Sequence, residues 1–94
     1  MKLWLLRPVV GLDENDNPWE PWYDKAFGFV VRAETEAEAR ELAHAEAGDE
    51  NRCEFLSAMT ANTDQPWKAA KYSTCTELLP DGEAGVVMQD FHAA

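Results

Sequence analysis

The sequence predicts an α+β protein with a single small sheet of about four strands and one main helix packed on one face. Three observations support this: short apolar or alternating segments near both ends, one Ala/Glu-rich helical segment after Thr35, and turn-forming residues around Pro80 and Gly82. A length of 94 residues with 46% hydrophobic residues fits a single domain over 1–94. The predicted order is strand, strand, helix, a variable stretch, strand, strand.

Two strands are expected before the helix. The segment Lys2 to Val9 is apolar on both faces, which is typical of a buried central strand, and Pro8 and Gly11 favour its end. The segment Ala26 to Ala33 alternates, because its large apolar residues recur at every second position. One face of this second strand would carry Phe27, Phe29 and Val31.

A helix is predicted from Thr35 to Ala47. Thr35 and Glu38 have the spacing of a capping box, and Gly48 is a natural C-terminal stop. At 100° per residue the apolar side chains share an arc of about 140°, with Leu42 as the main buried anchor. The arc consists of Ala39, Leu42, Ala43 and Ala47, whereas Glu38 and Glu41 point away from it and Arg40 and His44 lie on a flank.

The second half of the chain is predicted to hold a hairpin. The stretch Asp49 to Lys71 has no clear period, although Cys53, Leu56 and Met59 could share a short helical turn. Tyr72 to Leu78 alternates like a partly exposed strand. Turn residues follow at 80–83, and the apolar segment Gly85 to Phe91 predicts the returning strand.

The acidic residues are concentrated in less than half of the chain. Thirteen of eighteen lie between Asp13 and Glu54, against four basic residues, so this segment carries −9 of the formal charge of −10. Such a field repels nucleic acid and anionic membranes and attracts basic surfaces. Solubility alone also favours acidic surfaces, and on physical grounds the two interpretations have equal weight. No run of eighteen apolar residues predicts a membrane span, and the opening segment favours a strand over a signal peptide.

The loop from Val10 to Lys25 is longer than most and combines carboxylates with aromatic rings. Asp13 and Asp24 stand eleven residues apart, as the end ligands of an EF-hand loop do, but Pro18 replaces the required glycine. Calcium binding is therefore not expected. The rings of Trp19 and Trp22 fit either the core or an aromatic anchor within an interface.

No catalytic residues, cofactor or metal ligands are predicted. His44 and His92 lack zinc-site spacing, and a cysteine–histidine nucleophile pair has no third group to orient it. We therefore expect a binding protein and not an enzyme. The alternative is a small metal-binding or enzymatic accessory protein of a phage or bacterium that uses the Asp13–Asp24 loop or Cys53 and Cys75.

The opening MKLWLLRP and the middle FGFVVRAETEAEAR, with the size, acidity and element order, resemble small proteins encoded by phages and other mobile elements. Some of these are anti-CRISPR inhibitors. The resemblance has no diagnostic motif and carries over no residue by position. It implies an inhibitor that acts as a DNA mimic in the cytoplasm of a bacterial host.

Together, charge and resemblance predict a monomer whose partner is a basic nucleic-acid-binding protein, such as a CRISPR effector subunit that is blocked from its target DNA. Neither direct nucleic-acid binding nor membrane binding is expected. The residues predicted to contact the partner are Asp13, Glu14, Asp16, Trp19, Glu20, Trp22, Glu36, Glu38 and Glu41.

Overall fold

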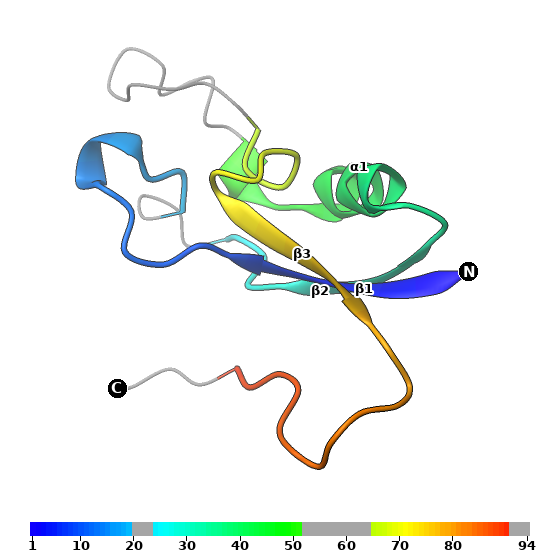
Figure 1. Cartoon of the computed structure of the whole chain (residues 1–94). Coiled ribbons are helices and arrows are strands. Elements are labelled where there is room, and N and C mark those ends of the chain that lie inside the picture. Colours follow the sequence, from blue (N-terminus) through cyan, green and yellow to red (C-terminus); the bar gives the residue numbers. More distant parts are fainter. Residues whose placement is uncertain (20–23, 52–64, 91–94) are drawn as a thin grey trace.

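The described residues fold as a three-stranded antiparallel sheet with one α-helix across one face (Figure 1). The computed structural model describes residues 1–19, 24–51 and 65–90. The α+β class is confirmed, whereas four strands in the predicted order are not. The described residues form β1 (Lys2–Pro8), the short 3-10 helix η1 (Glu14–Asp16), β2 (Phe29–Ala33), α1 (Glu36–Glu46) and β3 (Ser73–Leu78).

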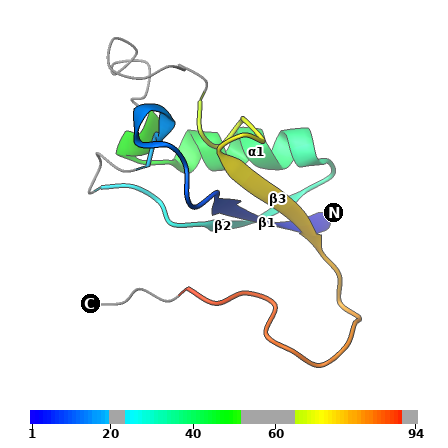
Figure 2. The same ribbon diagram turned by 60° about the vertical axis from the view of Figure 1, so that its left-hand side comes forward.

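Strand β1 is the central strand, as its apolar sequence predicts. It pairs antiparallel with β2 and with β3, so the strand order is β2-β1-β3. Leu6 lies opposite both Phe29 and Cys75, which places these three side chains on the face that α1 covers. Burial of β1 on both faces is not observed within the described residues. Helix α1 covers one face of the sheet, whereas Leu3 and Leu5 on the other face are partly exposed (Figure 2).

Strand β2 begins at Phe29, three residues later than expected. The backbone N–H of Ala26 donates to the carboxylate of Glu50 instead of a strand neighbour. From Phe29 onward the alternation holds, because Phe29 and Val31 pack against the core while Val30 faces solvent.

The helix follows the predicted bounds closely and begins with the predicted cap. The Thr35 hydroxyl accepts from the Glu38 backbone N–H at 3.2 Å, and the Glu38 carboxylate accepts from the Glu34 N–H at 2.9 Å. Ala39 and Ala43 are fully buried, so the backbone of α1 lies close to the sheet.

The expectation that Leu42 anchors the helix is wrong, because its side chain is 45% exposed. The buried face is centred on Ala39 and Ala43, and Leu42 lies to one side of it. Arg40, expected on a flank, is buried instead. Its guanidinium donates to the Trp67 carbonyl, to the Ser73 hydroxyl and carbonyl, and to the Glu36 carboxylate.

The core centres on Trp67, which the sequence left within the variable stretch. Trp67 is fully buried and makes edge-to-face contacts with Trp19 and Phe29, at ring-centroid distances of 4.8 and 4.9 Å. Each such contact contributes about 0.5–1.5 kcal/mol beyond burial. The short helical turn expected around Cys53 lies outside the described residues.

The predicted hairpin is also wrong within the described residues. After Leu78 the chain leaves the sheet, and residues 79–90 form no strand and are exposed throughout. Adjacent residues of a strand point to opposite faces of the sheet. The side chains of Val86 and Val87 could therefore not both be buried on one face. Phe91 lies outside the described residues.

Candidate protein-binding surface

The predicted partner-contacting residues do not form one patch. The acidic loop contacts the residues that follow α1, since the Asp49 N–H donates to the Asp24 carbonyl. Glu36 and Glu38 lie in the first turn, at the opposite end of a helix about 16 Å long. Both views place η1 beyond the C-terminal end of α1 (Figures 1 and 2).

Within the loop, several residues that were predicted to contact the partner have structural roles instead. The Asp13 carboxylate accepts from the Asn15 N–H and caps η1, while Glu14 is exposed. Asp16 accepts from the Tyr72 hydroxyl and pairs with Lys71. Partial burial alone would raise the pKa of Asp16, but the hydrogen bonds from Lys71 and Tyr72 and the Lys71 charge lower it below its ordinary value.

Trp19 is a core residue and not a surface anchor. Its side chain is 6% exposed, and its indole N–H donates to the Tyr72 carbonyl at 3.1 Å. The other two predicted loop contacts, Glu20 and Trp22, lie outside the described residues.

Glu50, one of the thirteen acidic residues between Asp13 and Glu54, is buried and does not contribute to the acidic surface. Its buried carboxylate accepts from the N–H groups of Ala26 and Gly48 and from the indole N–H of Trp67, at 3.1, 3.0 and 2.6 Å. It joins the loop, the end of α1 and the core, so this carboxylate has a structural role. Helical periodicity could not identify this role, because two of the three donors, Ala26 and Trp67, come from distant parts of the chain.

The solvent side of α1 carries several exposed carboxylates. Glu38, Glu41 and Glu46 are exposed there, and so is Leu42. Residues four apart on a helix are neighbours, so Leu42 lies between Glu38 and Glu46. We call Glu38, Glu41, Leu42 and Glu46 the acidic helix face. Sequence analysis did not identify Leu42 as a surface residue, because its helical spacing relative to Ala39 and Ala43 also fits a buried position.

Two predicted contact residues of α1, Glu36 outside this face and Glu41 within it, have basic neighbours. Glu36 pairs with Arg40 at 2.9 Å and keeps 51% of its side chain exposed. Glu41 pairs with Lys68 at 3.0 Å and keeps 65% exposed. The exposed pair of Glu41 and Lys68 contributes only about 0–1 kcal/mol, so a partner's cations can compete for Glu41. Arg40, which pairs with Glu36, is buried.

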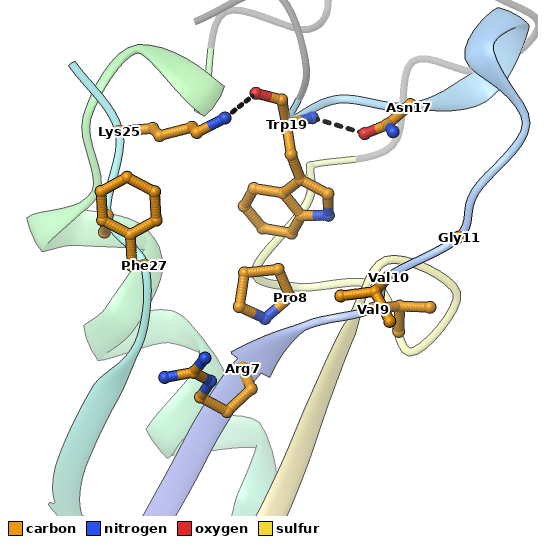
Figure 3. A pocket seen from close by; sticks show the side chains of 10 residues that line it. Arg7, Pro8, Val9, Val10, Gly11, Asn17, Trp19, Lys25 and Phe27 are labelled. Carbon is orange, nitrogen blue, oxygen red and sulfur yellow. Dashed lines mark hydrogen bonds between the residues drawn. The ribbon is translucent and has the colours of Figure 1, made fainter. Parts of the chain in front are cut away.

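A small cavity of about 270 Å³ lies where β1 meets the loop (Figure 3). The Lys25 ammonium at its rim donates to the Trp19 carbonyl, and Pro8 and Phe27 contribute apolar walls. Its volume is slightly below the usual range for ligand pockets, about 300–1,000 Å³. Its lining offers no pair of groups suited to acid–base or nucleophilic chemistry.

The alternative hypothesis relies on the Asp13–Asp24 loop or on Cys53 and Cys75. Among residues 1–19, 24–51 and 65–90, no three His, Cys, Asp or Glu side chains are grouped to hold a metal. Cys75 is a free thiol, and burial raises its pKa, which disfavours the reactive thiolate. Cys53 lies outside the described residues.

No protein-family model, curated protein or solved structure matches this chain. No helix in the described part of the chain is long and apolar enough to span a membrane.

Proposed function

We propose that this protein is a non-catalytic inhibitor that places its acidic helix face on a basic surface of a nucleic-acid-binding protein. One observation carries the proposal: three exposed carboxylates share the solvent side of α1 with an exposed leucine, Leu42, which Glu38 and Glu46 flank. The carboxylates attract Lys and Arg side chains, and Leu42 offers apolar contact that excludes water from the centre.

The charge spacing of α1 supports mimicry of a phosphate backbone. Four glutamates (Glu36, Glu38, Glu41 and Glu46) lie along its 11 residues. One strand of duplex DNA carries one charge per 3.4 Å, or about five over the same 16 Å. The acidic helix face supplies three of these four glutamates, because Glu36 pairs with the buried Arg40. The face is therefore sparser in charge than the strand that it would replace, but it extends over most of the same length.

The resemblance to anti-CRISPR proteins suggests the class of partner. A CRISPR effector holds its guide–target heteroduplex in a positively charged channel. An acidic helix bound in such a channel would block target DNA without any chemistry. The proposed site of action is accordingly the bacterial cytoplasm.

Charge reversal tests which acidic residues bind the partner. Tagged wild-type protein is used to capture proteins from a nuclease-treated bacterial lysate, beside a Glu38/Glu41/Glu46→Lys variant. A Glu14/Asp24/Asp81→Lys control changes the charge equally at exposed positions outside α1. We expect the control to retain a captured nucleic-acid-binding protein and the helix variant to lose it.

Leu42→Ala provides a second test that leaves the charge unchanged. Because Leu42 is exposed, this variant should fold normally but retain less partner. Equal capture by all variants, or equal loss with both triple variants, would contradict a role for the helix face.

A further inference from the structure

The sheet face opposite α1 is basic and apolar, in contrast to the rest of the surface. Alternation along the paired strands puts the same side of every strand on this face. We call it the open face. It comprises Leu3, Leu5, Arg7, Val30, Arg32 and Leu78, together with two threonines of β3. It has two arginines and, among the described sheet residues, no acidic side chain.

The C-terminal segment 79–90 has the complementary composition. It contains three acidic residues (Asp81, Glu83 and Asp90) and no Lys, Arg or His. Its large apolar side chains are exposed, and Val86 and Val87 are 80% and 75% accessible. A run of exposed apolar residues within an extended acidic segment is a candidate interface.

The two surfaces already touch at one point. An Arg7 Nη2 atom lies 3.9 Å from the Asp90 carboxylate, and the Arg7 guanidinium donates to the Met88 sulfur at 3.7 Å. Gly28 leaves room for this arginine, because a Cβ there would lie 3.1 Å from the Arg7 Cδ. Arg7 therefore recognises both the acidic and the apolar part of the segment.

Within one chain the fit is incomplete. The segment follows Leu78, which pairs with Leu3, and contacts the sheet near Arg7, at the other end of β1. Between these points it arches away on the side opposite α1 (Figures 1 and 2). This path leaves Val86 and Val87 unburied. A segment from another molecule is not connected to Leu78 of this sheet, so it can lie along the open face.

We propose that the open face binds the C-terminal segment of a second copy of this chain. Each copy would give its segment to the other, so that Asp90 of one lies on Arg7 of the other and the apolar residues between cover the sheet. Reciprocal exchange closes with two-fold symmetry and reuses a contact that one chain already makes. This surface is separate from the acidic helix face, and the proposal departs from the monomer expected from the sequence.

Sedimentation of the full chain tests the proposal. The mass should rise with concentration from 10.6 kDa toward twice that value. Arg7→Glu and Asp90→Arg should each remain monomeric, because each puts like charges together.

An equimolar mixture of these two variants should restore the dimer. At one of the two exchanged contacts, the unchanged Asp90 of the first variant meets the unchanged Arg7 of the second. At the other contact the two introduced side chains meet, and their charges are also opposite. Closure within one chain cannot be restored by mixing, so recovery of the dimer distinguishes exchange from closure.

Two further variants separate the interface from folding. Val87→Asp changes only an exposed side chain and should abolish association, while Glu46→Arg on α1 should not. Far-UV circular dichroism checks that each variant is folded. A wild type that stays monomeric at every concentration, a dimer that survives Val87→Asp, or a mixture of folded variants that stays monomeric would overturn the proposal.

Discussion

Replacing the buried Glu50 should destabilise the protein more than replacing any exposed glutamate. In Glu50→Ala, the N–H groups of Ala26 and Gly48 and the indole of Trp67 lose their acceptor. Each buried donor left without a partner costs about 1–3 kcal/mol. Removing a buried charge also removes its desolvation penalty, so we expect a net loss of about 3–5 kcal/mol.

Glu50→Gln should have an intermediate effect. The Glu50 Oε1 atom accepts from Gly48 and the Oε2 atom accepts from Trp67, whereas an amide has only one oxygen. One donor would therefore face the amide NH₂ group, at a cost of about 1–3 kcal/mol.

Urea unfolding at neutral pH, followed by tryptophan fluorescence, measures these losses, with Glu46→Ala as the exposed control. We expect the control to lie within about 0.5 kcal/mol of the wild type. Because a domain of this size is stable by about 5–15 kcal/mol, the Glu50→Ala loss is well resolved. If Glu50→Ala were as stable as Glu46→Ala, the proposed role of Glu50 in joining the loop, helix and core would be refuted.

Three other predictions concern α1 and the loop. Ala43→Leu should cost about 1–3 kcal/mol by overpacking the helix–sheet contact, whereas Ala45→Leu on the exposed side should be nearly neutral in the same urea assay. Thr35→Ala should cost about 0.5–2 kcal/mol, and unchanged thermal melting would contradict the cap. Because folding lowers the pKa of Asp16, its ionised form stabilises the protein above its ordinary pKa of 3.8. This contribution is lost as pH falls through the lower folded pKa, so the stability gap between wild type and Asp16→Asn should narrow in acid; a gap that does not narrow would contradict it.

The sequence predicted those parts of the fold that depend on local patterns. Capping chemistry and side-chain alternation depend only on neighbouring residues. They predicted the capped helix α1, the central strand β1 and the strand β3, which ends at Leu78. The predicted positions of Leu42 and Arg40 failed for a tertiary reason. Distant carbonyls at Trp67 and Ser73 draw the guanidinium inward, and alanine–sheet packing turns Leu42 outward.

The candidate site was only partly predictable for the same reason. Glu38 and Glu41 face solvent as helical periodicity indicates. By contrast, the burial of Trp19 and Glu50 depends on Trp67, which follows a stretch without a readable period. Acidic composition therefore identified the kind of surface, while the fold decided which carboxylates belong to it.

Competition with nucleic acid tests the central claim most directly. A fluorescent duplex bound to the purified captured partner, or to a CRISPR effector, is titrated with this protein while its anisotropy is followed. The proposal predicts stoichiometric release that weakens as salt rises and is lost with Glu38/Glu41/Glu46→Lys. A partner that binds this protein and the duplex together, with no change in anisotropy, would contradict the claim.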